Sequence, residues 1–129
     1  MSASLTRSRP ALVVALAAFG MSAAAHAADS ASDIAAGKEI AFGLKEGNCV
    51  ACHSLPGAAM AGNVGPRLGP WVHGVFHSES ELVKYLYDPQ AKFAHTVMPE
   101  FGKNKMLTEE QLEQVSAYVW SLSEKGERP

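Results

Sequence analysis

Cysteine is scarce in this chain of 129 residues, in which Cys49 and Cys52 are the only two. Structural zinc sites usually take four ligands from cysteine and histidine at fixed spacings, so one cysteine pair without a second argues against such a site. A redox dithiol of the thioredoxin kind also uses Cys-x-x-Cys, but it requires a βαβ context, and residues 37–46 before the pair indicate a helix. A partial metal site and a redox dithiol therefore remain as the weaker alternatives for this pair.

The chain also lacks an apolar run of the roughly 20 residues that a membrane-spanning helix needs. Its N-terminus instead has Arg7 and Arg9, an apolar run over residues 11–19, and the small-x-small sequence Ala25-His26-Ala27. This pattern predicts a secretory signal peptide that is cleaved after Ala27, with an uncleaved N-terminal anchor as the alternative.

Cleavage would remove residues 1–27 and leave residues 28–129, which is a length typical of one domain, in the periplasm. Nine Lys and Arg then remain against thirteen Asp and Glu, a net charge of about −4. Because nucleic acids and anionic membrane surfaces attract basic patches, neither is an expected partner. No stretch alternates apolar and polar residues for long, so the predicted fold class is all-α.

The segment Cys49-Val50-Ala51-Cys52-His53 is typical of a c-type haem attachment site. Two thiols at this spacing can add to the two vinyl groups of one haem, and the adjacent imidazole of His53 is then the proximal iron ligand. Covalent haem of this type is attached outside the bacterial cytoplasm, which agrees with the predicted signal peptide. Both cysteines would be used, so no disulfide is expected, and the haem would complete a core that a small chain builds poorly.

Residues 54–70, after the attachment segment, are punctuated by Gly and Pro and predict an ordered loop without a long helix or strand. A proximal histidine fixes its tautomer by donating its second ring N–H, and the carbonyl of Pro66 is the candidate acceptor. Arg67 and Trp71 both donate hydrogen bonds and are candidates to contact a haem propionate. A solvated Arg67 and a core Trp71 are the alternatives.

The first helix of the mature chain is predicted to start at Ser32 or Asp33, after a short polar segment, and to end at Gly47-Asn48. Gly37 lies inside it, which predicts close approach by another helix or by the haem, with a glycine that is merely tolerated there as the alternative. The expected apolar positions of this helix are Ile34, Ile40, Ala41 and Leu44.

Two capping boxes predict the other helices. Ser78 with Glu81 opens a helix that Asp88-Pro89 ends. Thr108 with Gln111 opens a last helix, whose apolar stripe consists of Leu112, Val115, Val119 and Leu122. The predicted architecture is therefore three to four helices wrapped around one covalent haem.

The second axial ligand decides the chemistry, because Met/His ligation suits electron transfer whereas a vacant position binds small molecules. Met98 is the predicted ligand, since it follows a long excursion from His53 and precedes a proline that stiffens its loop. Met60 follows His53 too closely to reach the distal side, and Met106, just before the last helix, is expected to pack in the core. His95 and a vacant position are the alternatives.

A helix, Cys-x-x-Cys-His, a Gly-Pro-x-Leu loop, Met-Pro and a terminal helix together resemble the class I cytochromes c. Over about residues 33–122 the chain is similar, more narrowly, to the SoxX family, the monohaem subunits of the SoxAX cytochromes of sulfur oxidation. The sequence blocks that carry this resemblance are Gly47-Asn48-Cys49-Val50-Ala51-Cys52-His53-Ser54-Leu55-Pro56-Gly57, Gly62-Asn63-Val64-Gly65-Pro66, Thr96-Val97-Met98-Pro99-Glu100-Phe101-Gly102 and Leu107-Thr108-Glu109-Glu110. Arg67 departs from the family, which often has an apolar residue or proline there.

The resemblance implies a class I cytochrome c fold, one haem c, and the electron-transfer role in an L-cysteine S-thiosulfotransferase complex. In that complex, thiosulfate is joined oxidatively to a cysteine of the carrier SoxYZ, and two electrons are released. A SoxA-like subunit, dihaem or monohaem, carries the active-site haem with a cysteine ligand, and the SoxX-type haem passes electrons to a soluble cytochrome. This chain has no cysteine to spare, so no catalytic residue is expected in it.

A free-standing electron shuttle and a haem-based sensor with an open distal position are the competing functions. The apolar run directly after the attachment segment bears on the choice, because a small domain cannot bury all of it. We expect part of this run to stay exposed and to dock a SoxA-like subunit, with complete burial under the haem as the alternative. The run consists of Leu55, Pro56, Ala58, Ala59, Met60 and Ala61.

Overall fold

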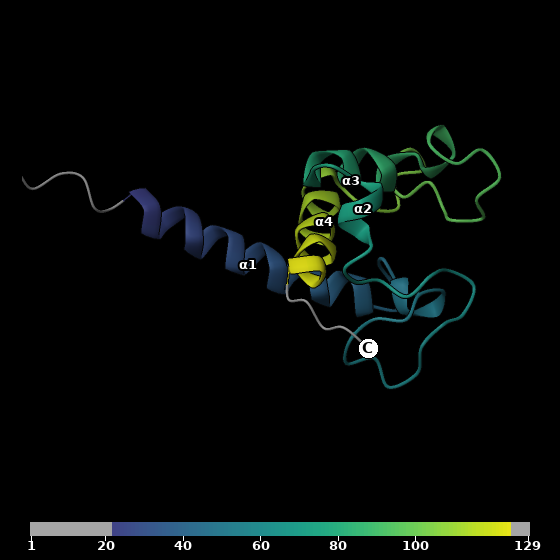
Figure 1. Ribbon diagram of the computed structural model, residues 1–129, viewed down its shortest axis with the longest axis horizontal. Coiled ribbons are helices and arrows are strands. Elements are labelled where there is room, and N and C mark those ends of the chain that lie inside the picture. The colour runs from purple at the N-terminus through teal and green to yellow at the C-terminus, as the bar shows by residue number, and fades with distance from the viewer. Residues whose placement is uncertain (1–21, 125–129) are drawn as a thin grey trace, which may run out of the picture.

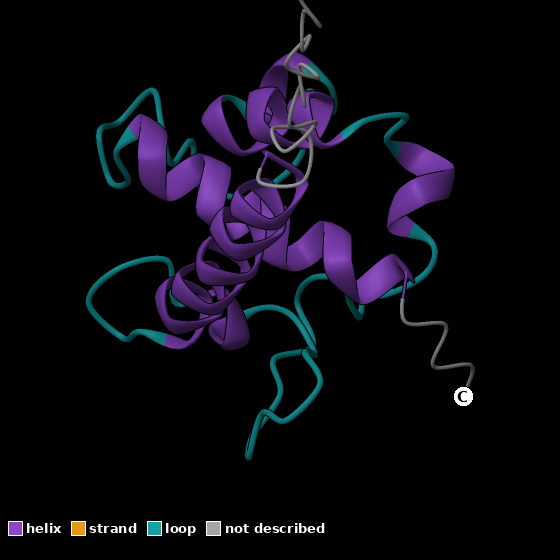
Figure 2. Cartoon of the chain, turned by 90° about the vertical axis from the view of Figure 1, so that its left-hand side faces the viewer, coloured by secondary structure: helices purple, strands orange, loops and turns teal. Residues whose placement is uncertain are grey.

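The computed structural model describes residues 22–124, and all regular structure among them is helical. The all-α prediction, with three to four helices, is confirmed in this part of the chain (Figures 1 and 2). In chain order the elements are α1 (Ser22–Phe42), η1 (Cys49–Ala51), α2 (Val72–Val75), α3 (Glu79–Tyr87), η2 (Pro89–Ala91) and α4 (Glu109–Glu124). No helix in this range combines the length and the apolar character needed to cross a membrane.

Helix α1 begins about ten residues before the predicted start at Ser32 or Asp33. The preceding segment is rich in alanine, the strongest helix former, so the helix continues through the two residues expected to cap it. The predicted polar lead-in is therefore wrong. The signal-peptide features at Arg7, Arg9 and residues 11–19 lie outside the described residues.

The end of α1 is also earlier than predicted, at Phe42 instead of Gly47-Asn48. Gly43 donates its N–H to the carbonyl of Glu39 at 2.8 Å, and the chain then turns toward Asn48, which adopts a left-handed conformation with φ 43° and ψ 41°. Leu44 lies in this turn and is 82% exposed, so its predicted place on the apolar face of the helix is wrong.

Helix α4 is central, because α1, α2 and α3 all contact it, and Figure 1 shows α1 crossing it. Gly37 lies at this crossing. A β-carbon there would be 1.8 Å from the backbone oxygen of Gln114, so only glycine allows the two helices to come this close. The close approach predicted for Gly37 is thus confirmed, and its partner is a helix. The core at this crossing includes Ile40, Ala41, Leu112, Val115 and Val119.

The capping box of Thr108 and Gln111 is complete, whereas that of Ser78 and Glu81 has only its first bond, because Glu81 accepts from His77 and not from Ser78. Ser78 Oγ accepts the N–H of Glu81 at 3.2 Å, and the carboxylate of Glu81 accepts the N–H of His77 at 2.8 Å. Thr108 and Gln111 exchange the two expected bonds, at 3.2 Å and 3.0 Å. These caps fix where α3 and α4 begin, and the second therefore fixes where the loop between them ends.

Candidate functional site

The segment from Cys49 to His53 forms one tight turn at the end of the α1 region. Its first three residues are η1, and the N–H of His53 donates to the carbonyl of Cys49 at 2.8 Å. Cys49 and Cys52 are free, half-buried thiols, and both line one cavity together with His53. Desolvation by burial, aided by the proximity of Cys52, raises the pKa of the Cys49 thiol to about 11.

Two glycines of the following loop press against this turn. A β-carbon at Gly62 would lie 2.3 Å from the carbonyl oxygen of Ala51, and one at Gly65 would lie 2.4 Å from Cε1 of His53. The Gly62 N–H also donates to the carbonyl of Val50 at 2.9 Å. The loop therefore packs with bare backbone against the attachment turn and against one face of the imidazole.

The expected hydrogen bond between His53 and Pro66 is present, with Nδ1 of the ring 2.7 Å from the Pro66 carbonyl oxygen. A carbonyl can only accept, so Nδ1 carries the proton and donates. The Nε2 lone pair is then free to bind a metal, and the ring orientation is fixed. This is the arrangement that a ligating histidine needs.

Beside the turn lies an apolar cavity of about 300 Å³, enclosed by the loop, α2, α3 and α4. It is lined by Cys49, His53, Pro66, Leu68, Trp71, Val72, Val75, Phe76, Leu82, Tyr85, Leu86, Phe93, Met98, Val115 and Val119. A second hollow of about 530 Å³ adjoins it and includes Cys52. The two share Cys49, His53, Pro66, Tyr85 and Met98.

This arrangement fits a haem. A large flat apolar group requires an apolar slot. The wall common to both hollows carries the Cys49 thiol, the oriented imidazole of His53 and the thioether sulfur of Met98, and the Cys52 thiol lines the larger hollow alone. Nitrogen and soft sulfur donors are those that haem iron accepts in cytochromes c. No group of three or more His, Cys, Asp and Glu side chains able to hold a metal ion gathers among residues 22–124.

Met98 is half-buried and lines both hollows. Its N–H donates to Thr96 Oγ1 at 3.2 Å, and the Thr96 side chain also shares a hydrogen bond with the hydroxyl of Tyr85. Burial raises the pKa of Tyr85, whose ring packs between those of Phe76 and Phe93. Helix α3 therefore holds the Met98 segment through Tyr85.

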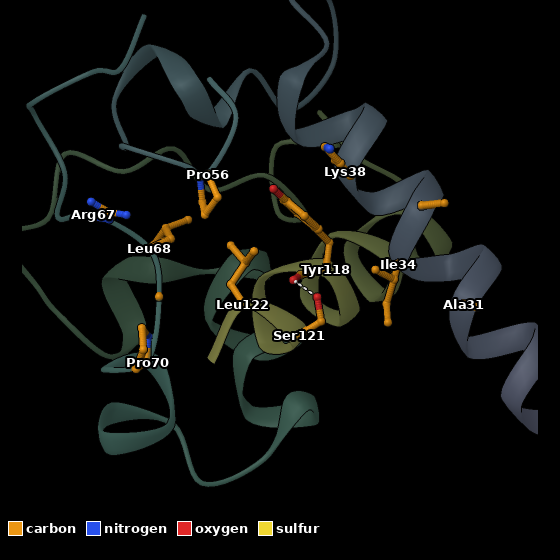
Figure 3. Close-up of a pocket in the computed structure, with 12 residues that line it drawn as sticks. Ala31, Ile34, Lys38, Pro56, Arg67, Leu68, Pro70, Tyr118, Ser121 and Leu122 are labelled. Atoms are coloured by element: carbon orange, nitrogen blue, oxygen red, sulfur yellow. Dashed lines mark hydrogen bonds between the residues drawn. The ribbon is translucent and has the colours of Figure 1, made fainter. Parts of the chain in front are cut away.

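Trp71 and Arg67, the two residues predicted to contact a haem propionate, line different cavities. Trp71 lines the apolar cavity, and its indole N–H donates to the carbonyl of Arg67. The exposed side chain of Arg67 instead lines a different cavity, of about 350 Å³, between α1, the loop and α4 (Figure 3). Only Leu68 belongs to both cavities. The propionate contact predicted for Trp71 stays a prediction. The propionate contact predicted for Arg67 also stays a prediction, and the placement of Arg67 in the other cavity does not support it.

The other two methionines and His95 were also weighed as iron ligands, and all three side chains are exposed. His95 and Met60 are exposed and line neither hollow around His53. Met106 is 49% exposed and lines the hollow that contains Cys52, so the expectation that it packs in the core is wrong. The turn before α4 directs it outward instead, because Phe101 and Leu107 fill the core there.

Sequence reasoning did not single out Tyr85. It also missed Phe76 and the steric role of Gly65. The Gly-Pro sequence at 65–66 was a usable signal for the last of these, since a glycine beside the histidine's acceptor indicates close approach. No local pattern distinguishes Tyr85 or Phe76 from other core residues.

Comparison with known proteins gives one family. The model of the cytochrome c family matches residues 34–123, well over half of the chain. The matched range contains the attachment turn, both predicted iron ligands and all of the core around them. No curated protein matches the chain.

Proposed function

The chain belongs to the cytochrome c family, and from this premise we propose that it is the electron-transfer subunit of a SoxAX-type L-cysteine S-thiosulfotransferase. Family membership makes it an electron-transfer c-type cytochrome with covalently bound haem c. The more specific role rests on the resemblance to the SoxX family together with the character of one surface. The single bound haem iron would supply one-electron redox chemistry.

Four residues of the chain would hold that haem. Cys49 and Cys52 would form its two thioether bonds, and His53 and Met98 would be the axial ligands. The Pro66 carbonyl accepts the N–H of His53 Nδ1, which leaves Nε2 of the neutral ring for the iron, and Thr96 Oγ1 accepts the backbone N–H of Met98. With two ligands present, the site would have no open position for a substrate, which disfavours the sensor.

The observation that carries the proposal is an apolar rim around the attachment turn. Four strongly exposed hydrophobic residues line the hollow that contains Cys52 and His53. They are Leu44 at 82%, Val64 at 64%, Val97 at 82% and Met106 at 49% exposure. We call this set the apolar rim. Among the described residues, Lys45 and Glu46 are the only ones lining the hollow that carry Lys, Arg, Asp or Glu charges, and they are of opposite sign.

The apolar rim favours a subunit over a shuttle. Transient redox partners find each other through complementary charged surfaces and bury little area. A permanent subunit interface has an apolar centre depleted of charges, as this rim does. Exposed apolar groups gathered at one place are otherwise a liability in a free protein. The part of the rim that a bound haem would leave uncovered therefore supports a stably bound partner.

Part of the apolar run after the attachment segment is also exposed and available to a partner. Leu55 is buried, as the alternative required, but Ala59, Met60 and Ala61 are exposed, with Met60 at 87%. These three residues directly precede Gly62, whose backbone touches the attachment turn. They would extend the surface that a SoxA-like subunit covers.

The proposed partners follow the resemblance. A SoxA-like cytochrome would bind the rim and carry the catalytic haem, the carrier SoxYZ would meet the complex, and a soluble cytochrome would accept the electrons. The proposed location is the periplasm, after cleavage at Ala27 into a domain of residues 28–129. The catalytic cysteine ligand would lie on the partner, because both cysteines of this chain lie in the attachment turn.

The test is association with a SoxA-type protein. The mature holoprotein and its coexpressed partner should elute together from gel filtration at micromolar concentration and remain together at about 0.5 M salt, because salt screens charge pairs and not apolar contacts. The complex, and neither subunit alone, should couple thiosulfate to SoxYZ. A holoprotein that binds no SoxA-type protein, yet is oxidised by a soluble cytochrome, would favour the free-standing shuttle.

A further inference from the structure

Lys103 fastens the loop from Met98 to Leu107 to the end of α3. Its ammonium group lies 3.1 Å from Asp88 Oδ2, at the C-terminal cap of α3, and 3.0 Å from Glu100 Oε1, in the loop itself. The backbone N–H of Lys103 also donates to the carbonyl of Tyr87 at 3.1 Å. One residue thus joins the helix end to the loop through both its backbone and its side chain.

The neighbouring glycine makes this junction tight. A β-carbon at Gly102 would lie 2.1 Å from Cδ2 of Tyr87, so the loop backbone rests directly on the tyrosine ring. Phe101 is buried and its carbonyl accepts the N–H groups of Met106 and Leu107, at 2.8 Å and 3.0 Å. The loop is therefore rigid on the side that follows Lys103.

The two carboxylates at the junction depend on the same cation. The side chains of Asp88 and Glu100 are only 24% and 17% exposed, and Asp88 Oδ1 is buried with no hydrogen-bonding partner among the described residues. Contacts with Glu100 first and Asp88 second raise the pKa of Lys103, which therefore stays charged at neutral pH. Without the ammonium group, two partly desolvated negative charges would face each other across the helix–loop junction.

We propose that Lys103 is a positioning residue for Met98, holding the loop against α3 so that the methionine sulfur stays within reach of the iron. Glu100 is two residues from Met98, and Pro99 between them limits how far the backbone can absorb a displacement. Repulsion between Asp88 and Glu100 would therefore move the Met98 segment outward. This inference rests on the proposed ligation by Met98.

The experiment is an imidazole titration of the oxidised holoprotein, followed through the weak sulfur-to-iron charge-transfer band. Imidazole competes with Met98, so its apparent affinity reports how firmly the methionine is held. Lys103→Met should raise that affinity roughly threefold to tenfold, the range expected for loss of a small ion-pair network. Lys105→Met is the matched control, because it removes the same charge from the same loop and Lys105 has no ion pair among the described residues.

A second variant tests the cause. In the triple variant Lys103→Met, Asp88→Asn, Glu100→Gln the repulsion is gone, and imidazole affinity should return to within about twofold of the parent. Equal imidazole affinity for the parent and Lys103→Met would overturn the proposal, as would an equal rise in Lys105→Met. If the charge-transfer band survives Met98→Ala, Met98 is not the iron ligand, and Lys103 cannot act by positioning it.

Discussion

The imidazole of His53 and the backbone of Gly65 lie in direct contact. A β-carbon on Gly65 would come within 2.4 Å of Cε1, 2.6 Å of Nδ1 and 2.8 Å of Nε2 of the ring. Three ring atoms would thus be displaced by one methyl group, and the next residue supplies the carbonyl that orients the same ring. The Gly65–Pro66 pair therefore sets both the position and the tautomer of the proposed proximal ligand.

Gly65→Ala should accordingly reduce haem incorporation severalfold, because the ring must move away from the geometry in which it can bind iron. The measurement is the ratio of covalent haem to polypeptide in the exported protein. Gly69→Ala is the matched control in the same loop, since no atom beyond its two chain neighbours would lie within 4 Å of the added β-carbon. That control should keep the parent ratio and gain about 0.4–1 kcal/mol of stability through a less flexible unfolded chain. Equal haem contents in the two variants would refute the steric role of Gly65.

Local signals in the sequence were sufficient for the parts of the fold that local contacts determine. The boxes at Ser78 and Thr108 each need only a side chain and a backbone N–H three residues away, so the starts of α3 and α4 follow from the sequence. The Cys-x-x-Cys-His spacing likewise determines one turn. At α1, however, the capping signal at Ser32 competes with an alanine-rich helix, and the stronger propensity extends the helix.

What depends on contacts between distant segments could not be predicted. Leu44 and Met106 are apolar residues next to helices, and periodicity assigns such residues to the core, yet both are exposed on the apolar rim. Arg67 and Trp71 are four residues apart, and only the packed structure shows that they line different cavities. Tyr85 holds the Met98 segment through Thr96, eleven positions later in the chain, a relation that no local pattern encodes.

Haem attachment should be covalent through Cys49 and Cys52, which line one hollow with His53. After acid–acetone extraction the denatured polypeptide should retain its haem absorption and show the mass increment of a single haem. Cys49→Ala or Cys52→Ala should lower the yield of holoprotein strongly, since the haem would contribute to the packing of the apolar cavity as well as to electron transfer. Extraction of all haem from the wild-type chain would show that attachment is not covalent.

Met98 should be the distal ligand. Met98→Ala should abolish the sulfur-to-iron charge-transfer band of the oxidised protein, lower the reduction potential and open the iron to carbon monoxide in the reduced state. His95→Ala serves as the control, because His95 is exposed and lines neither hollow. If instead Met98→Ala keeps the parent spectrum while His95→Ala changes it, ligation is by two histidines. Carbon monoxide binding by the wild type would indicate an open position and a sensor.

New carboxylates on the proposed partner surface should weaken binding of the partner. Val97 belongs to the apolar rim and Met60 to the exposed run after the attachment segment, and both side chains are more than four-fifths exposed. A carboxylate at either position would have to be desolvated when an apolar partner covers it, so Val97→Glu and Met60→Glu should each weaken binding to a SoxA-type subunit by tenfold or more, about 1.4 kcal/mol or above.

Calorimetry and gel filtration would measure this affinity, with the absorption spectrum recorded to show that the haem site is intact. Gln90→Glu is the control, because it places the same new carboxylate on an exposed residue of η2 that lines neither hollow. If Val97→Glu weakens binding and Met60→Glu does not, the interface is confined to the apolar rim and excludes the run after the attachment segment. If neither variant differs from Gln90→Glu, the partner binds elsewhere, and the exposed hydrophobic residues around His53 need another explanation.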